Sequence, residues 1–509
     1  MSIQDKILPL DALGTRIRDL KTQGKRVAHC HGTFDLLHPG HLRHLERARR
    51  EGDLLVVTLT ADAYVNKGPG RPVFNENLRA ESLAALAAVD WVGIVFDATA
   101  LPAIEAIRPD AYIKGQDYKN ASDDVTGNIA RERAAVEKHG GSLVFTEEIT
   151  FSSTSLLNQH FDVFPPATKD FLARFKASHP VQTTLDAIDS LRPMRVLVLG
   201  EAIIDEYCYS SPLGQTGKSG NILAVKYLSS EKFAGGSLAV ANHLAGFCAH
   251  VTLVTGLGRN SADEAMLRER LLPNVEAVFF HFDQAPTLLK RRYLDTEMNK
   301  LFEVYHFEEQ SVDAELDERM SRWLLTHAAN YNVVVVPDYG NGLISDRMID
   351  ALTRSARFLA VNTQLNSGNR GYHVVTRYPR ADFISLNEPE VRLAAHDKFS
   401  PLKTVAEQVA RRVNAPRIAI TRGIHGAMLM DLQHDQAFDV PALSTRVVDR
   451  IGAGDAFLSL AGLCLGGGLS PEMALFTGSA AAALDVQIVC NRESIQRGSL
   501  FKYITTLLK

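Results

Sequence analysis

The sequence predicts an α/β protein with two domains, of which the first contains a doubly wound parallel sheet. Three observations support this prediction. The chain has 509 residues, which is too long for one hydrophobic core. Short apolar runs typical of buried strands alternate with amphipathic segments typical of helices. The segment Phe164-Pro165-Pro166-Ala167 interrupts this alternation. We therefore expect a first domain at residues 1–163, a helical linker at 164–192 and a second domain at 193–509.

The first domain is predicted from five apolar runs separated by helical segments. The runs cover residues 26–30, 53–60, 91–96, 111–113 and 142–145, and the clearest helices cover residues 42–50 and 77–89. Strands that alternate with helices in this way form a parallel, Rossmann-like sheet. Ligands of such sheets bind beyond the carboxyl ends of the strands, so the functional residues are expected there.

The segment 31–41 (H-G-T-F-D-L-L-H-P-G-H) joins the first strand to the first helix. Pro39 suits the first helical turn, and His38 and His41 share one helix face. Imidazole donors, free backbone amides and the positive end of the helix dipole together favour phosphate oxygens. We expect a nucleotide phosphate here; the alternative is a pair of ordinary surface histidines. Nucleotide binding is also assigned to Gly32, Thr33 and Phe34.

Two weaker candidates follow later strands. Lys114 comes after the fourth strand and places a cation near a triphosphate or an acceptor phosphate. Ser152, Ser153 and Thr154 precede a helical segment, where they cap the helix and donate to a phosphate. The plainer alternatives are a simple turn at Lys114 and a simple helix cap at the three hydroxyl residues.

These segments resemble the motifs of the nucleotidyltransferase superfamily, in its cytidylyltransferase-like branch, over about residues 25–160. The pattern G-x-F-D-x-x-H-x-G-H lies at 32–41, K-G-x-D-Y at 114–118, and a segment similar to I-S-S-T-x at 151–155. Residues 71–73, 79 and 88–92 also match the adenylyltransferase half of the bacterial bifunctional heptose kinase/adenylyltransferases.

This resemblance implies that His38 and His41 stabilise the charge on a transferred α-phosphate, with Lys114 as a further catalytic residue. It implies ATP or CTP as the nucleotide. Arg79 then either holds a phosphate or lies on a solvated helix face, and Asp35 orders the histidine loop.

The second domain is predicted from apolar strands that end in glycine or an acid. The runs cover residues 196–205, 251–254, 333–336, 383–386 and 418–420, with helices at 238–247 and in the alanine-rich run 480–484. The strongest segment is Gly452-Ala453-Gly454-Asp455, where two glycines free the backbone at a helix start so that amides can face an anion. Asp455 sits where a carboxylate takes a proton from a hydroxyl that attacks a γ-phosphate. The alternative is a plain glycine turn with a capping Asp.

Residues 194–505 resemble the ribokinase/PfkB carbohydrate kinases, which implies a ribokinase-like α/β fold that uses ATP and Mg²⁺. Asp455 falls on the catalytic base of that family. The substrate-side residues of the family fall on Asp205, Gly235 and Gly236. Its nucleotide-side residues fall on Asn387, Glu390, Thr421, Gly423, Gly426, Gly452, Ala453 and Gly454. Asn387 and Glu390 would place Mg²⁺ through water.

Three departures from the heptose kinases lie on the expected sugar side. Their D-P-K-G is replaced by residues 362–365 (N-T-Q-L), and their S-D-Y-A-K-G by residues 337–342 (P-D-Y-G-N-G), so that an acid and two lysines are lost. Ala239 replaces an Asn. Asp338 is kept and is assigned to the substrate. The losses favour a substrate without a phosphate, or a domain that binds sugar or ATP without transferring phosphate.

The composition excludes several other classes of function. The net charge of −4 provides no basic surface for nucleic acid. Five scattered cysteines without C-x-x-C spacing argue against disulfides or a zinc site and fit a reducing compartment. The first residues lack a signal-peptide pattern, and no apolar stretch reaches 18 residues. We therefore expect a cytoplasmic protein without a membrane partner, and we assign no metal-ligating residues.

The leading hypothesis is a bifunctional enzyme of nucleotide-sugar synthesis, with the domain order reversed relative to the heptose enzyme. Its kinase would phosphorylate a heptose-like sugar or sugar phosphate with ATP. Its transferase would join the product to AMP or CMP and release pyrophosphate, as lipopolysaccharide or capsule synthesis requires. The alternative is a single-activity nucleotidyltransferase whose kinase-like domain is a non-catalytic binding or scaffolding module. Kinase relatives often pair, so we expect a homodimer.

Overall fold

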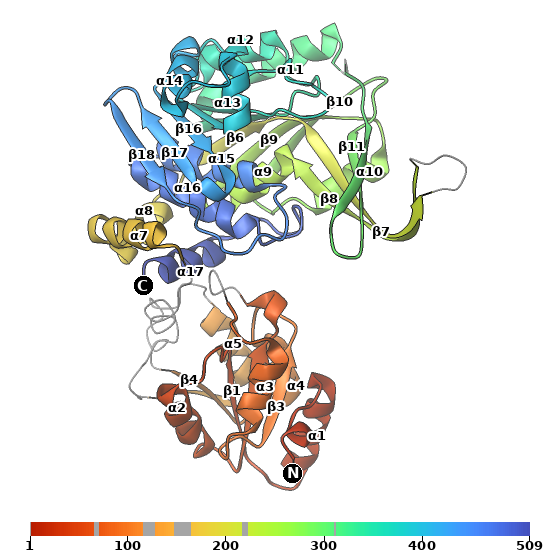
Figure 1. Cartoon of the computed structure of the whole chain (residues 1–509). Coiled ribbons are helices and arrows are strands. Elements are labelled where there is room, and N and C mark those ends of the chain that lie inside the picture. The colour runs from red at the N-terminus through yellow and green to blue at the C-terminus, as the bar shows by residue number, and fades with distance from the viewer. Residues whose placement is uncertain (1, 66–70, 116–127, 147–163, 216–221, 310–311) are drawn as a thin grey trace. The chain divides into compact units, whose positions relative to one another are not determined.

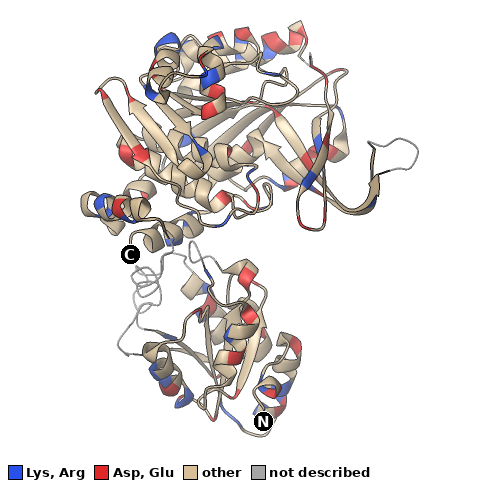
Figure 2. Ribbon diagram, in the orientation of Figure 1, with Lys and Arg blue, Asp and Glu red and all other residues tan. Residues whose placement is uncertain are grey.

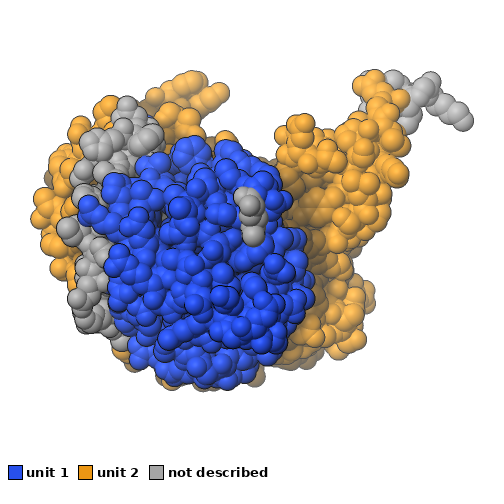
Figure 3. Space-filling view, turned by 90° about the horizontal axis from the view of Figure 1, so that it is seen from below, with its two compact units in different colours: residues 1–165, 501–509 blue, residues 166–500 orange. Residues whose placement is uncertain are grey.

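The computed structural model describes residues 2–65, 71–115, 128–146, 164–215, 222–309 and 312–509. The chain divides into two compact units, one of residues 1–165 with 501–509 and one of residues 166–500 (Figure 3). Ser152, Ser153 and Thr154 lie outside the described residues.

The first unit contains a five-stranded sheet in the order β3-β2-β1-β4-β5, and every pair of neighbours is parallel. Its strands are β1 (Val27–Gly32), β2 (Leu54–Thr60), β3 (Trp91–Val95), β4 (Ala111–Gly115) and β5 (Ser142–Thr146). Its helices are α1 (Leu10–Thr22), α2 (Pro39–Arg49), α3 (Glu76–Ala84), α4 (Leu101–Ile107) and α5 (Asn128–Lys138). The predicted doubly wound parallel sheet is confirmed.

Helices cover both faces of this sheet, which explains why its strands are apolar throughout. Leu45 of α2 and Leu83 of α3 pack on one face, and Leu13 of α1 and Ile107 of α4 pack on the other. The order of the strands reverses beside β1, which lies at the centre. In such sheets the crevice at this reversal binds ligands, and the histidine segment follows β1 directly.

The second unit is built on a nine-stranded sheet in the order β10-β9-β6-β13-β14-β15-β16-β17-β18. Neighbours are parallel from β10 to β16, whereas β17 and β18 are antiparallel additions. The strands are β6 (Arg195–Leu199), β9 (His250–Leu257), β10 (Val275–His281), β13 (Val333–Asp338), β14 (Leu359–Thr363), β15 (Phe383–Asn387), β16 (Arg417–Thr421), β17 (Ala427–Asp431) and β18 (Gln436–Val440).

Helices also cover both faces of the large sheet (Figure 1). The helices are α7 (Pro166–Ser178), α8 (Val181–Asp189), α9 (Ser237–Ala245), α10 (Ser261–Glu269), α11 (Ala314–His327), α12 (Asp346–Ser355), α13 (Glu388–Ala395), α14 (Leu402–Arg412), α15 (Ala453–Gly466) and α16 (Pro471–Asp485), and α17 (Arg497–Leu507) follows. Side chains of α11 to α14 share one core with the sheet. The apolar run 480–484 is part of the buried helix α16, as predicted.

A second sheet of four strands was not predicted. It has the order β12-β11-β7-β8, and its strands are β7 (Ala202–Gln215), β8 (Leu223–Gly236), β11 (Leu288–Leu294) and β12 (Lys300–His306). The single strand expected at 196–205 is in fact divided, because β6 ends at Leu199 and β7 begins at Ala202. Asp205 therefore belongs to the small sheet and not to the end of a strand of the large one.

The expected linker is helical. Phe175 of α7 stacks on Phe476 of α16 at 4.0 Å between ring centroids, so α7 packs on α16 within the second unit. On the outer helices, acidic and basic side chains alternate and form i,i+4 pairs such as Asp350–Arg354 and Glu407–Arg411 (Figure 2). Within the described residues, no helix has the length and apolar character needed to cross a bilayer.

Candidate functional site

The two histidines of the first unit lie together at the start of α2. His38 is the N-cap residue, and its Nδ1 accepts a hydrogen bond from the Gly40 amide at 3.1 Å. The His38 and His41 rings stack with centroids 3.9 Å apart. Burial lowers the pKa of His38, so this ring is neutral near pH 7. With Nδ1 as the acceptor, the proton of the neutral ring resides on Nε2, which is then a donor.

The segment between β1 and α2 is fixed by contacts to distant parts of the chain. Phe34 has a positive φ of 48°. Its ring packs edge-to-face with the His41 ring, with the ring centroids 5.5 Å apart. Asp35 Oδ1 accepts hydrogen bonds from the amides of Val73 at 2.6 Å and Phe74 at 3.3 Å. The predicted role of Asp35 in ordering this loop therefore has a structural basis.

Arg79 is neither on a solvated surface nor directed to a ligand, so both expectations for its position are corrected. Its side chain is 1% exposed. Its donors bond to the carbonyl oxygens of Phe74 at 2.9 Å, Thr33 at 2.5 Å and Thr60 at 2.8 Å, and to Asp62 at 2.5 Å. These bonds occupy every nitrogen of the guanidinium. Arg79 thus holds the strand ends and the phosphate-site loop in place.

Lys114, at the end of β4, forms an ion pair with Glu132 of α5 at 2.9 Å. Both side chains are largely buried, and the Tyr112 hydroxyl also donates to Glu132 at 3.3 Å. The cation is therefore near the carboxyl ends of the strands, as expected, but it is compensated by an acid in this structure. The His31 ring at the end of β1 is held by Thr58 at 2.9 Å and Thr60 at 3.2 Å.

In the second unit, the Gly452–Gly454 turn begins α15, the most apolar helix of the core. Gly452 has a φ of 100°, which favours glycine. A Cβ atom at Gly452 would lie 2.7 Å from Asp485 Oδ2 and 2.8 Å from Asn491 Oδ1, so a side chain would collide there. Gly454 has no atom within 4 Å of its Cβ position and leaves the amides of the turn open. The turn is thus suited to an anion.

Asp455 lies in the first turn of α15, beside this anion site. Its side chain is partly accessible, but it is surrounded by protein. Its pKa is raised to about 7, chiefly by burial and also by the charges of Asp205 and Glu390, while the Tyr339 hydroxyl and the Lys290 charge oppose the shift. A carboxylate with a pKa near neutrality is a suitable general base.

Asp205 lies close to the glycines that were assigned to the substrate. In the antiparallel pair β7–β8, Asp205 lies opposite Phe233, while Gly235 and Gly236 lie opposite Ile203 and Ala202. A Cβ atom at Gly235 would lie 1.9 Å from Asp205 Oδ2. Glycine is therefore needed for the carboxylate to take this position. Asp205 also forms a buried ion pair with Arg292 of β11, which in turn bonds to Glu303 at 3.0 Å. The structure brings Asp205, Gly235 and Gly236 together in the β7–β8 pair, and their role in substrate binding stays a prediction.

Asn387 and Glu390 form a capping box at the start of α13. The Asn387 side chain accepts a hydrogen bond from the Glu390 amide at 2.9 Å, and Glu390 accepts from the amides of Asn387 at 2.8 Å and Leu365 at 3.1 Å. Burial raises the pKa of Glu390 to about 7. Both carboxylate oxygens are therefore engaged by the backbone, and direct coordination of a metal ion does not fit them. A water-mediated contact does fit.

The nucleotide-side glycines lie at the end of β16. Gly423 and Gly426 have φ angles of 57° and 78°, and a Cβ atom at Gly426 would lie 2.0 Å from the Val440 carbonyl oxygen. This close approach closes the hairpin from Thr421 to β17. Ile424 is exposed at the tip of the turn.

Asp338 is buried at the end of β13, and its oxygens are used within the protein. They accept hydrogen bonds from the Gly340 amide at 3.0 Å and the Tyr378 hydroxyl at 2.9 Å. Next to it, Glu201 accepts from the amides of Asn341 at 3.0 Å and Tyr339 at 3.1 Å. Burial and the Asp338 charge raise the pKa of Glu201 to about 7.

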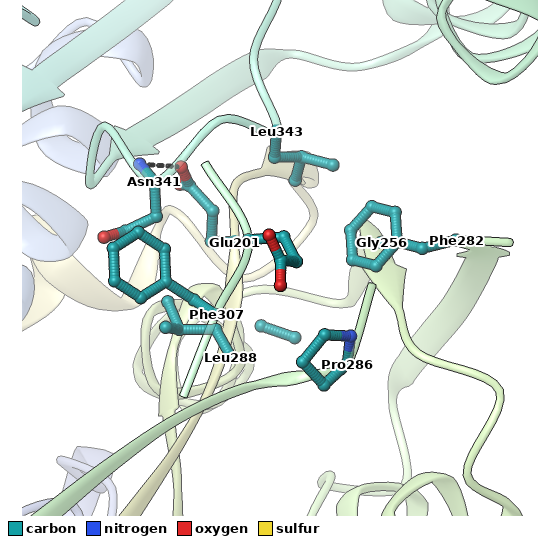
Figure 4. Close-up of a pocket in the computed structure, with 10 residues that line it drawn as sticks. Glu201, Gly256, Phe282, Pro286, Leu288, Phe307, Asn341 and Leu343 are labelled. Carbon is teal, nitrogen blue, oxygen red and sulfur yellow. Dashed lines mark hydrogen bonds between the residues drawn. The ribbon is translucent and has the colours of Figure 1, made fainter. Parts of the chain in front are cut away.

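The second unit has two cavities near residues of the candidate site. The smaller, of about 20 Å³, lies between Glu201 and the rings of Phe282 and Phe307 (Figure 4). It has room for roughly one water molecule and cannot hold a sugar. The larger, of about 410 Å³, is lined by residues of β8, α9 and segment 491–496. Its lining includes Asn491, which lies beside both Gly235 and Gly452.

Sequence reasoning missed several charged residues of this site, notably Glu201, Lys290 and Arg292. Lys290 and Arg292 both come from β11, whose alternate residues are buried. Leu288, Lys290, Arg292 and Leu294 are every second residue of this strand, so they lie on one face. The two leucines could have identified that face as buried, but charged residues in a strand normally mark its solvent face.

Two family models match the chain. A model described as pfkB family carbohydrate kinase matches residues 194–494, and a model described as cytidylyltransferase-like matches residues 29–159.

The curated relatives match the first unit. The bifunctional protein HldE of Methylobacillus flagellatus is 42% identical over 153 residues, and that of Geotalea uraniireducens is 42% identical over 152 residues. Each match covers 30% of this chain and 30% of the relative, so the chain spans less than a third of the relatives' length.

Among solved structures, phosphofructokinase-2 from Escherichia coli in complex with potassium aligns with a TM-score of 0.50 and 16% identity. The alignment covers 62% of this chain and all of that one. The same enzyme in complex with substrates and products gives a TM-score of 0.50 and 14% identity. At these identities the likeness shows a shared fold.

Proposed function

The chain belongs to the pfkB family of carbohydrate kinases, and on that premise we propose that it is a bifunctional enzyme that makes a nucleotide-activated sugar. The kinase domain transfers the γ-phosphoryl group of ATP to a sugar or sugar phosphate. The cytidylyltransferase-like domain joins the phosphate of the product to AMP or CMP and releases pyrophosphate. We assign these activities to domains at residues 1–163 and 193–509, joined by the helical segment 164–192.

The observation that carries the kinase proposal is the position of Asp455 beside the open amides of the Gly452–Gly454 turn. A carboxylate with a pKa near 7 can remove a proton from a sugar hydroxyl at the moment that the hydroxyl attacks phosphorus. The amides at the start of α15 stabilise the charge on the transferred group. Phosphoryl transfer requires this alignment and charge stabilisation, and little covalent chemistry from the protein.

The transferase proposal depends on the stacked pair His38 and His41. The neutral His38 ring presents Nε2–H as a donor at the positive end of α2, where α-phosphate oxygens gain charge in the transition state. The HldE proteins carry "bifunctional" in their names and match this unit at 42% identity. The name of these relatives supports the proposal of two activities in one chain.

ATP is the proposed kinase cofactor, and ATP or CTP the transferase substrate. Mg²⁺ is proposed to arrive with the nucleotide, since Glu390 can contact it only through water. Within the described residues, no three His, Cys, Asp or Glu side chains gather into a metal site. Mg²⁺ commonly keeps several waters and binds mainly to substrate phosphates, so this arrangement fits it.

A substrate panel tests the proposal directly. Purified protein should consume ATP with at least one free or phosphorylated pentose, hexose or heptose, and should release pyrophosphate with a sugar 1-phosphate and ATP or CTP. ATP binding without consumption across the panel would favour the alternative, a non-catalytic kinase-like module. The retained Asp455 and the family match argue against that alternative.

The kinase activity is expected to depend on pH because Asp455 must be ionised to act. Its pKa of about 7 predicts that kcat/KM rises about tenfold per pH unit below pH 7 and levels off above it. An ordinary Asp, with a pKa near 4, would give a flat profile over pH 5.5–9. Glu201→Gln serves as the control because Glu201 is a second buried acid with a pKa of about 7. If the midpoint of the kcat/KM profile near pH 7 disappears in Glu201→Gln but persists in Asp455→Glu, the titrating group is not Asp455.

We propose that the chain forms a homodimer through the β7–β8 ribbon. The outer half of this ribbon extends away from the body of its unit (Figure 1). Its exposed apolar side chains are Leu213, Leu223, Tyr227 and Leu228. An isolated two-stranded ribbon with exposed apolar side chains is marginal in water, and pairing with a second copy covers it. We expect Leu228→Glu to halve the mass measured by light scattering, and Leu325→Glu, on α11, to leave it unchanged. A wild-type chain that is monomeric at micromolar concentration would contradict this.

We propose a cytoplasmic location, because all five cysteines are unpaired and buried thiols, as in reducing compartments.

A further inference from the structure

Lys290 is a buried lysine whose charge acts on Asp455. It lies on β11, directly between Asp205 of β7 and Tyr305 of β12 in the register of the small sheet. Its side chain is 4% exposed. Among the described residues, its ammonium has no hydrogen bond or ion pair, and its Nζ lies over the Tyr305 ring, 5.3 Å from the ring centroid.

The contrast with Arg292 shows that this lysine is unusual. Arg292 lies two residues along on the same buried face of β11 and is satisfied by Asp205 and Glu303. Asp205 is thereby committed to Arg292, and it does not lie within 4 Å of Lys290. Burial of an ammonium group without a direct partner is strongly unfavourable. Such a group is expected to meet an anion during the working cycle of the protein.

The surroundings of Lys290 place it in the proposed kinase site. Its charge acts on the pKa of Asp455, and the charges of Asp205, Glu201 and Glu303 act on its own. Burial lowers the pKa of Lys290, and a bound dianion would reverse this shift. The ammonium is therefore coupled by charge to the proposed base, and its residue lies opposite Asp205 in the small sheet.

The expected cations of the sugar side are absent from the loops of the large sheet. Asn341 and Gln364 occupy the positions of the two missing lysines, and the Asn362 amide is bonded to the Ser385 carbonyl oxygen at 2.7 Å. Lys290 belongs to β11 of the small sheet. We infer that the small sheet supplies the positive charge that the loops of the large sheet lack at these two positions.

We propose that Lys290 binds a phosphoryl oxygen in this site, either of the sugar's own phosphate or of the γ-phosphate of ATP. This proposal rests on the proposed kinase function. The bond is a charge-assisted hydrogen bond from Nζ to the phosphoryl oxygen, which is stronger than a neutral one. With the sugar phosphate as its source, the kinase would prefer phosphorylated sugars despite the loss of the two loop lysines.

The test uses the full-length Lys290→Met variant, which keeps the apolar stem against Tyr305 and removes the charge. Lys403→Met, on the exposed face of α14, is the matched control. Steady-state kinetics with ATP are measured on free sugars and sugar phosphates, and inorganic phosphate is titrated as an inhibitor. Calorimetric binding of inorganic phosphate is measured as well, because it does not require turnover. The phosphate site of the first unit is common to all the variants, so the difference between wild type and Lys290→Met isolates this site.

We expect kcat/KM to fall about 10- to 100-fold in Lys290→Met, the effect of one charged hydrogen bond, and inhibition by phosphate to be lost. A rise in KM confined to sugar phosphates identifies the sugar's phosphate as the ligand, and a fall in kcat on all sugars identifies the γ-phosphate. Kinetics and phosphate binding equal to wild type would overturn the inference while leaving the kinase function intact. If the wild type consumes no ATP, calorimetry decides: loss of one phosphate site in Lys290→Met supports the inference, and an unchanged number of sites overturns it.

Discussion

The Asp455→Asn variant is expected to lose sugar-dependent ATP consumption by a factor of about 10²–10⁴, the usual contribution of a general base. The amide has almost the same shape as the carboxylate but cannot accept a proton from the sugar hydroxyl. The Gly452–Gly454 amides remain in place, so ATP should still bind with nearly unchanged affinity. Nucleotidyl transfer from a supplied sugar phosphate should also persist, because its histidines lie in the other unit. Coupled-enzyme detection of ADP and calorimetry with ATP measure the two effects.

Asp350→Asn is the matched control, because Asp350 is an exposed acid on α12 that pairs with Arg354. It should match wild type in every assay. Substantial ATP consumption by Asp455→Asn would remove Asp455 from the role of base. An equal loss of ATP affinity would instead indicate that the carboxylate acts through the structure of the turn.

The His41→Ala variant is expected to lower nucleotidyl transfer by about 10²–10³, the effect of losing one preorganised donor to a developing negative charge. The His41 ring stacks on His38 within the first turn of α2 but does not cap the helix. Its removal should therefore leave the unfolding temperature nearly unchanged. Pyrophosphate release with a sugar phosphate and ATP or CTP measures the effect, and ADP formation by the kinase domain serves as an internal standard.

His38 requires a different substitution because it caps α2. His38→Ala would also remove the acceptor for the Gly40 amide, at a cost of about 1 kcal/mol. His38→Asn keeps a capping oxygen and removes the imidazole donor, so a similar loss of transfer is expected with less effect on stability. His434→Ala, at an exposed site of the second unit, is the control for both. Transfer that survives in His41→Ala and His38→Asn would exclude the histidine pair from the transition state.

The parallel sheets and the histidine helix could be predicted because their determinants are local. Strands that are covered on both faces are apolar throughout, as in the run that forms β1, and the helical segments between them have a clear apolar face. Pro39 begins α2 as predicted, and the glycines at 235 and 452 lie where a side chain would collide with an acid. Such positions show in the sequence because no other residue type fits.

Some residue roles could not be read from motifs, because one pattern serves more than one purpose. Asn387 and Glu390 fit a nucleotide motif and also a capping box, and the structure uses them as a capping box. Arg79 fits a phosphate ligand, but each of its three side-chain nitrogens bonds to a backbone oxygen, and one of them also bonds to Asp62. Only the positions of the partners, which are remote in sequence, distinguish these uses.

The order of elements, the parallel sheets and the helix starts thus follow from local pattern in this chain. The four-stranded sheet does not, because it depends on the pairing of β7 with β11, in which Asp205 lies opposite Lys290, 85 residues further along the chain. The buried face of β11 also carries charges. That sheet brings together Asp205, Lys290 and Arg292. The charges of Asp205 and Lys290 then act on Asp455. Burial of a charged side chain depends on partners from several strands, and no local pattern in the sequence specifies those partners.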